Sequence, residues 1–251
     1  MDELTSDALT ADYRVLQRKR GHRYSLDDVL TAYVACEAEP EAAEVLDLGT
    51  GIGSVLMMVA WKRPAARLVG VEAQEGSYAL LQENLEANGL AARVRTIHGD
   101  FREPEVRAAI GGRFSLVTGT PPYFPPGTAS VSPDPQRAYA RVELRGGVEA
   151  YVETASLFLD DEGTFVVCAG AGAEPRVRGA ADRHGLFVHA RLDAIPRRGR
   201  APLFSVYTLR RSAPETTWEG AFVAREADGT RTAEYVALRA YFGLTQKEDR
   251  G

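Results

Sequence analysis

Residues 45–53 have the sequence Val-Leu-Asp-Leu-Gly-Thr-Gly-Ile-Gly, and this stretch decides the fold. The apolar start predicts a buried strand, and the glycines predict a tight loop that opens a helix over 52–61. Such glycines let a ligand approach the backbone at the carboxyl end of a sheet. A dinucleotide-binding loop needs the pattern G-x-G-x-x-G. If the pattern starts at Gly49, its third glycine is replaced by Ser54, and a start at Gly51 fails as well. The pattern therefore disfavours NAD.

Strands and helices alternate on both sides of this loop, which predicts an α/β fold with a Rossmann-like, doubly wound sheet. The segment 196–202 joins the last two strands and is too short to hold a helix, so we expect the last strand to be antiparallel in an otherwise mostly parallel, seven-stranded sheet. Strands are expected at 45–48, 67–72, 94–98, 114–118, 163–169, 186–192 and 203–209, and helices at 26–37, 52–61, 78–88, 148–159, 174–184 and 232–242.

Composition excludes several classes of protein. The 251 residues are 45% hydrophobic and 26% charged, as in ordinary globular proteins, and no apolar run is long enough for a membrane span. The polar, acidic N-terminus does not resemble a signal peptide, so we expect a cytoplasmic protein. Cys36 and Cys168 lie far apart, which excludes a disulfide scaffold and a cysteine-built zinc site. The four histidines have no metal-ligand spacing, so no metal is expected.

The net charge of −5 argues against nucleic acid when it is read globally, but the charge is segregated. Residues 14–23 hold five Lys and Arg and no acid, and residues 191–211 hold six arginines and one aspartate, so the rest of the chain carries −15. Such runs are either solvated loops or a local docking surface for a polyanion. The motifs described below favour a local docking surface for a polyanion.

Acidic residues follow the next two strands. Glu72 ends the second strand and suits the two hydroxyls of a ribose, as an acid does in nucleotide-binding sheets. Asp100 and Phe101 follow the third strand and suit an adenine amine and its ring face. A nucleoside bound across three strand ends without a pyrophosphate indicates S-adenosylmethionine. The candidate cofactor-binding residues here are Asp47, Gly49, Thr50, Gly51, Glu72, Ala73, Asp100 and Phe101.

The fourth strand is followed by Thr120-Pro-Pro-Tyr-Phe124. The two prolines fix the backbone, and the aromatic residues can stack on a planar substrate. The side chain of Thr120 and the carbonyl of Pro121 can accept both hydrogens of a planar amine and aim its lone pair at a methyl group. We therefore expect methylation of a planar amine, with catalytic residues Thr120, Pro121, Pro122 and Tyr123.

Over nearly the whole chain, these motifs resemble the bacterial tRNA(Val) adenine-N6-methyltransferases, which are class I S-adenosylmethionine-dependent methyltransferases with an Asx-Pro-Pro-aromatic motif. The resemblance includes Gln17 through Asp27, the glycine loop, the Pro-Pro-Tyr loop, the loop at 197–202 and the terminal stretch 228–235. Here Thr120 replaces the family's usual Asn, and a hydroxyl is the weaker acceptor.

The resemblance implies one methyltransferase domain over 1–251, with a basic arm (1–24), an entry helix (25–43), a catalytic core (44–211) and a C-terminal extension (212–251). It places Tyr24 and Asp27 at the methionine end of the cofactor, although Tyr24 could equally pack at the helix entry. Arg141 and Glu143 line the substrate side or form a structural ion pair. The candidate substrate-binding residues are Tyr123, Phe124, Arg18, Lys19, Arg141, Arg197, Arg198 and Arg200.

The expected substrate is an adenine in tRNA. A glutamine amide in a protein and a small-molecule amine are the enzymatic alternatives. A cofactor-binding protein that contacts RNA with little catalysis is the non-enzymatic one.

Overall fold

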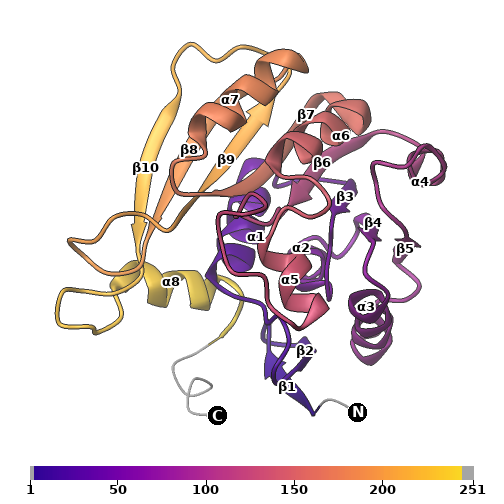
Figure 1. Cartoon of the computed structure of the whole chain (residues 1–251), viewed down its shortest axis with the longest axis horizontal. Coiled ribbons are helices and arrows are strands. Elements are labelled where there is room, and N and C mark those ends of the chain that lie inside the picture. Colours follow the sequence, from indigo (N-terminus) through magenta and orange to yellow (C-terminus); the bar gives the residue numbers. More distant parts are fainter. Residues whose placement is uncertain (1–2, 245–251) are drawn as a thin grey trace.

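The structure is a computed structural model that describes residues 3–244 (Figure 1). The ends of the expected arm and extension, at 1–2 and 245–251, lie outside this range. A two-stranded hairpin is formed by β1 (Leu4–Ala8) and β2 (Arg14–Arg18). The main sheet contains β3 (Glu44–Leu48), β4 (Arg67–Glu72), β5 (Val94–His98), β6 (Phe114–Gly119), β7 (Leu159–Gly170), β8 (Phe187–Ile195), β9 (Phe204–Arg210) and β10 (Trp218–Val223). The helices are α1 (Leu26–Ala38), α2 (Ser54–Lys62), α3 (Glu75–Ala87), α4 (Pro104–Ile110), α5 (Pro135–Arg141), α6 (Val148–Phe158), α7 (Glu174–Arg183) and α8 (Ala233–Tyr241).

The main sheet has eight strands in the order β10-β8-β9-β7-β6-β3-β4-β5. Strand β9 runs antiparallel to both of its neighbours, and the other pairs are parallel. The Rossmann-like, mostly parallel α/β fold is thus confirmed, but the predicted count of seven strands is wrong. The missed strand is β10, which extends the sheet beyond β8. Its first four residues are mostly exposed and only its last two are buried, so its sequence carried little apolar signal.

The predicted basic arm contains a hairpin over residues 4–18, where the sequence predicts no strand. The hairpin is fastened to α3 by Asn84, whose side chain accepts from the backbone N–H of Leu16 at 2.6 Å and donates to its carbonyl at 3.1 Å. The same amide donates to the carbonyl of Ile52 at 2.9 Å. One side chain therefore connects the hairpin to the glycine loop.

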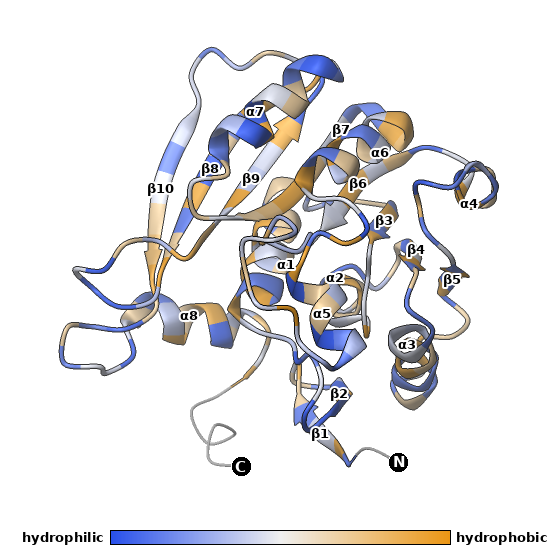
Figure 2. Ribbon diagram, in the orientation of Figure 1, coloured by the Kyte–Doolittle hydropathy of each residue, from blue (hydrophilic) through white to orange (hydrophobic). Residues whose placement is uncertain are grey.

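Helices cover both faces of the main sheet. The residues Leu30 of α1, Met57 of α2 and Leu81 of α3 pack on one face, whereas Val152 of α6 and Val177 of α7 pack on the other. Figure 2 shows hydrophobic residues along the central strands and mostly hydrophilic ones in the two loops beside α8. Strands covered on both faces are apolar throughout, which is why their positions were readable from the sequence. Among the described residues, no helix is long and apolar enough to span a membrane.

Helix α8 begins at Thr232, which is buried at the end of the β10 connection. Its hydroxyl accepts from the N–H of Tyr235 at 3.1 Å and donates to the carbonyl of Val223 at 2.5 Å. We expect Thr232→Ala to lower the free energy of unfolding by about 1–2 kcal/mol, because the helix loses its cap and the Val223 carbonyl loses a partner. Denaturant titration measures this, and Thr232→Ser, which keeps both hydrogen bonds, should recover most of the loss.

Candidate functional site

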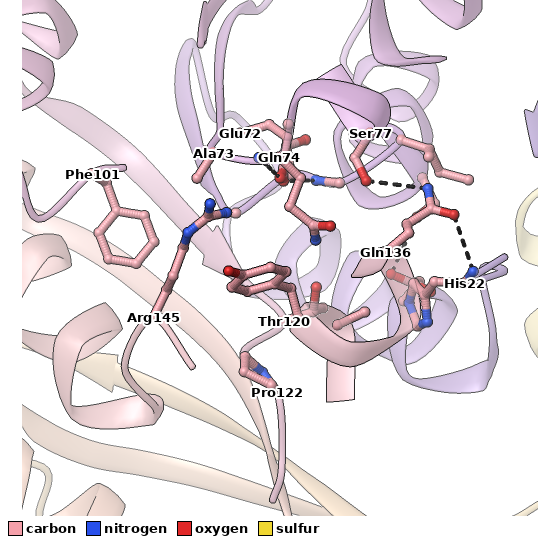
Figure 3. A pocket seen from close by; sticks show the side chains of 18 of the residues that line it. His22, Glu72, Ala73, Gln74, Ser77, Phe101, Thr120, Pro122, Gln136 and Arg145 are labelled. Atoms are coloured by element: carbon pink, nitrogen blue, oxygen red, sulfur yellow. Dashed lines mark hydrogen bonds between the residues drawn. The ribbon is translucent and has the colours of Figure 1, made fainter. Parts of the chain in front are cut away.

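The carboxyl ends of β3, β4, β5 and β6 meet at a cavity (Figure 3). Its wall contains most of the residues predicted to bind a cofactor. The predicted cofactor-binding and catalytic residues that line it are Tyr24, Gly49, Thr50, Gly51, Glu72, Ala73, Asp100, Phe101, Thr120 and Pro122. Parallel strands end at one edge of a sheet, so residues that are far apart in sequence converge here.

Glu72 is fixed by the glycine loop opposite it. Its carboxylate accepts from the backbone N–H of Gly51 at 2.8 Å and of Gln74 at 2.6 Å. Burial raises the pKa of Glu72, and these hydrogen bonds oppose the shift. Gly51 has a positive φ of 59°, and a Cβ there would meet no atom within 4 Å. The loop therefore leaves open space beside a buried carboxylate.

Asp47 does not line the cavity. Its carboxylate accepts from the hydroxyls of Thr50 at 2.6 Å and Thr118 at 2.7 Å, and burial raises its pKa to about 6. It holds the glycine loop against β6, so we assign it a positioning role. A Cβ on Gly49 would come within 2.2 Å of the Tyr151 hydroxyl, which explains the glycine at that position.

Asp100 and Phe101 form the far wall. The Asp100 carboxylate accepts from the guanidinium of Arg102 at 2.9 Å and 2.6 Å. Burial acts to raise the pKa of Asp100, but the bonds to Arg102 outweigh it and lower the pKa. The Phe101 ring is held edge-on against Tyr151. Both side chains are thus preorganised beside the cavity.

Asp28, which was not singled out from the sequence, lines this cavity, whereas its neighbour Asp27 does not. The Asp28 carboxylate accepts from the N–H of Ser25 at 2.8 Å and the hydroxyl of Ser54 at 3.2 Å. Burial, and then the neighbouring Asp27 carboxylate, raise the pKa of Asp28 to about 8. Tyr24 both lines the cavity and packs at the helix entry, where its hydroxyl donates to the carbonyl of Ala8.

The Thr120 loop separates this cavity from a second one. Thr120 lines both cavities, and Pro121, Tyr123, Phe124, Asp27 and Arg141 line only the second. The two are therefore adjacent at Thr120, which Figure 3 shows above Pro122 in the cofactor cavity.

Tyr123 is held firmly in the wall of the second cavity. Its hydroxyl donates to Asp27 at 2.8 Å and lies 3.1 Å from the Cys168 sulfur, and its ring is stacked near Phe204. Burial raises the pKa of Tyr123 well above its ordinary value, so the residue is a neutral wall of the cavity. Phe124 is 37% exposed at the mouth, with the Arg141 guanidinium 5.7 Å from its ring centre.

Three of the six predicted substrate-binding basic residues are ion-paired. Arg18 pairs with Asp134 at 2.5 Å, Lys19 with Glu3 at 3.0 Å and Arg198 with Glu226 at 2.6 Å. Arg197, Arg198 and Arg200 lie in the loop between β8 and β9 and line neither cavity. Glu143 pairs with Arg176 and not with Arg141.

Several cavity residues were missed by sequence reasoning. His22, Gln136 and Ser77 are connected by hydrogen bonds of 3.2 Å, and Tyr139 and Arg145 come from residues 119–147, where the sequence predicts neither a helix nor a strand. Helix α5 begins at Pro135 with the Asp134 carboxylate as its cap, which was a readable start signal. No signal marked which of its residues face the cavity.

The residues present fit S-adenosylmethionine. Gly51 leaves room for a ligand, and Phe101 offers a ring face. Glu72 and Asp28 are buried carboxylates, and no cationic side chain of the described residues lies within hydrogen-bonding distance of either. Glu72 would hold the ribose, Asp100 and Phe101 the adenine, and Asp28 the α-ammonium group. In the described part of the chain, no group of three potential metal ligands is found.

Comparison with known proteins supports this fit. Residues 45–124 match the family model described as "Methyltransferase domain". The release factor glutamine methyltransferase of Geobacter sulfurreducens is 34% identical over 159 residues, which is 60% of this chain and 54% of that protein. The tRNA1(Val) (adenine(37)-N6)-methyltransferase of Bacteroides thetaiotaomicron is 30% identical over 166 residues, covering 64% of this chain and 66% of that protein. The chain thus spans less than two thirds of either relative.

A solved structure shares the fold. A predicted O-methyltransferase from Agrobacterium tumefaciens has a TM-score of 0.66 and 20% identity, covering 87% of this chain and 98% of that one. The sheet, the cavity and the matched segment make the chain similar to the class I methyltransferases, whose methyl donor is S-adenosylmethionine. Within this class, the chain is similar to the bacterial tRNA(Val) adenine-N6-methyltransferases, as its motifs predicted.

Proposed function

We propose that the chain is an S-adenosylmethionine-dependent N-methyltransferase whose substrate is a planar exocyclic amine, namely adenine N6 in tRNA. One observation carries the proposal: Thr120 lies at the junction of the two cavities. A cofactor in the first cavity and a base in the second would meet at this residue. The proposal takes residues 1–251 as one methyltransferase domain.

The chain contributes mainly positioning. The bound cofactor supplies an electrophilic methyl group. The Thr120 hydroxyl, which has no hydrogen-bond partner among residues 3–244, and the Pro121 carbonyl accept the two amine hydrogens. The amine lone pair then points toward the first cavity. After transfer the nitrogen carries a positive charge and releases a proton to water, so no strong base is needed. Orientation of this kind supplies much of the acceleration in such reactions.

An RNA substrate is supported by the charge of the second cavity. Arg23, Arg137 and Arg141 line it, and Asp27 and Asp28 are its only acidic lining residues in the described part of the chain. The side chains of Arg137 and Arg141 have no ion pair in residues 3–244, and the Arg141 guanidinium stands beside the exposed ring of Phe124. A ring for stacking a splayed base next to free guanidinium groups suits a single-stranded RNA loop.

A glutamine amide in a protein is the second candidate. The similarity to a release factor glutamine methyltransferase favours it, and an amide NH₂ presents the same two hydrogens to Thr120 and Pro121. The arginines that line the second cavity favour the RNA substrate over this alternative.

The deciding experiment is transfer of labelled methyl from S-adenosylmethionine to total tRNA, followed by nucleoside mass spectrometry. We expect label in N6-methyladenosine. Label confined to protein would support the glutamine alternative, and cofactor binding without any transfer would leave a non-catalytic RNA-binding protein.

The raised pKa of Asp28 predicts pH-dependent cofactor binding. Below its pKa of about 8 this carboxyl is mostly protonated and cannot pair with an ammonium group. Calorimetric affinity for S-adenosylhomocysteine should therefore rise by up to about tenfold per pH unit from about pH 6 to about pH 8, then level off. Asp28→Asn should remove this slope. 5′-Methylthioadenosine lacks the ammonium group, so the pH dependence of its affinity reports only titration of the other groups at the site, Glu72, His22 and Asp47. An equal pH dependence of the affinity for both ligands would contradict the assignment of Asp28.

The ion pairs around the basic segments predict which arginines bind RNA. Replacing Arg137 and Arg141 together with Glu should weaken tRNA binding by about a hundredfold. It should also reduce the slope of log binding constant against log salt concentration by about two, since each phosphate contact contributes about one. Reversing Arg18 and Lys19, which have acidic partners, should change the slope less. Filter binding over a salt series measures both, with Arg67→Glu at the opposite edge of the sheet as control. Equal effects from the two pairs would mean that ion pairing does not select the RNA contacts.

A further inference from the structure

The side chain of Arg145 lies in the cofactor cavity, on the wall that faces Glu72 and Asp100. Figure 3 shows it extending beside Phe101 toward Glu72 and Ala73. Its guanidinium carbon lies 4.3 Å from the ring centre of Tyr139. The side chain is therefore among the residues assigned above to the ribose and the adenine.

One donor of this guanidinium is unused. Arg145 Nη1 is buried and has no hydrogen-bond partner within residues 3–244. The two nearby carboxylates attract Arg145 electrostatically, but among the described residues neither accepts a hydrogen bond from it. Glu72 accepts from the backbone of Gly51 and Gln74, and Asp100 accepts from Arg102. A buried donor without an acceptor is costly, so an acceptor supplied by a ligand would be favourable here.

The backbone that carries Arg145 is fixed on both sides. On the preceding side, the N–H of Glu143 donates to the carbonyl of Phe124 at 2.9 Å, and its carboxylate receives two hydrogen bonds from Arg176. On the following side, Gly146 has a φ of 87°, and a Cβ there would approach Ala150 to 3.0 Å. The side chain is thus presented to the cavity by an anchored turn.

We propose that Arg145 is a cofactor-contacting residue that binds the nucleoside part of S-adenosylmethionine, with its guanidinium plane against the adenine ring and Nη1 donating to a nucleoside acceptor. This inference rests on the proposed function. A planar guanidinium stacks on aromatic faces and donates in a fixed geometry, which a lysine ammonium cannot reproduce. The contact closes the cavity on the side opposite the glycine loop.

Calorimetry on the full chain tests the contact with two ligands that share the nucleoside, S-adenosylhomocysteine and 5′-methylthioadenosine. Arg145→Ala should weaken both by the same factor, about tenfold. Arg145→Lys, which keeps the charge but loses the plane, should recover less than half of that loss in free energy. Arg67→Ala, an arginine at the far edge of the sheet, is the matched control, and near-ultraviolet circular dichroism reports whether each variant keeps its packing.

Three results would overturn the inference. Tighter binding by Arg145→Ala would mean that the side chain obstructs the nucleoside site and does not form it. Weakening for S-adenosylhomocysteine alone would place the contact at the amino-acid end. Full recovery by Arg145→Lys would reduce the role to charge. Failure of the wild-type chain to bind either ligand is a different result, since it would refute the proposed function itself.

Discussion

Replacing Glu72 with alanine is expected to weaken S-adenosylhomocysteine binding by about a hundredfold, the largest loss of affinity predicted for a single side chain here. Two effects combine. The ribose loses a charged acceptor for its hydroxyls, and hydrogen bonds to charged groups contribute more than neutral ones. In addition, the N–H groups of Gly51 and Gln74 lose the acceptor that holds the loop in place.

Glu72→Gln separates these two effects, because the amide keeps one acceptor for the loop but loses the charge. We expect it to bind about tenfold less tightly than wild type. Glu75→Ala, an exposed acid in the same connection, serves as control and should leave the affinity unchanged. Unchanged calorimetric affinity in Glu72→Ala would mean that the nucleoside binds elsewhere in the cavity.

The second large effect is expected at Thr120. Thr120→Val keeps the shape of the side chain but removes the acceptor, so it should lower kcat by about a hundredfold, as loss of one positioned hydrogen-bonding group does in other active sites. Single-turnover transfer of labelled methyl to tRNA measures the chemical step directly. Affinity for S-adenosylhomocysteine provides the control for cavity integrity and should change far less than kcat.

Thr120→Asn tests the same idea in the opposite direction. A carboxamide oxygen is a stronger acceptor than a hydroxyl, so this variant should preserve or raise the rate. Complete loss of transfer in Thr120→Asn would instead give the hydroxyl a specific role that asparagine cannot perform. A normal rate in Thr120→Val would leave the Pro121 carbonyl as the sole effective acceptor.

Charge illustrates a limit of sequence reasoning. Two segments of +5 on a chain of −5 predict a docking surface, but their acidic partners lie far away in sequence. Arg18 pairs with Asp134, 116 residues later, and Arg198 pairs with Glu226, 28 residues later. The Arg198 pair is exposed, so it is weak and exchangeable and Arg198 can still meet phosphate, whereas the Arg18 pair is half-buried. The strongest candidates become Arg137 and Arg141, which an arginine count could not distinguish.

Neighbouring residues on a helix illustrate another limit. The resemblance assigned the cofactor to Asp27, but Asp28 lines the cofactor cavity and Asp27 contacts Tyr123. Successive helical residues point about 100° apart, so Asp28 reaches the walls of both cavities whereas Asp27 lines only the second. Only the orientation of α1 on the sheet decides which cavity each one faces.

The sequence by itself determined the strand ends and the glycine loop, because buried parallel strands are apolar throughout and their carboxyl ends share one edge. On that basis alone, Glu72, Asp100 and Thr120 are predicted to lie at one site. The tertiary structure decided the rest: strand β10, whose pairing is through the backbone, the ion pairs of the basic segments, and the entry of Arg145 into the cavity. These depend on contacts between distant segments, and local sequence patterns do not encode such contacts.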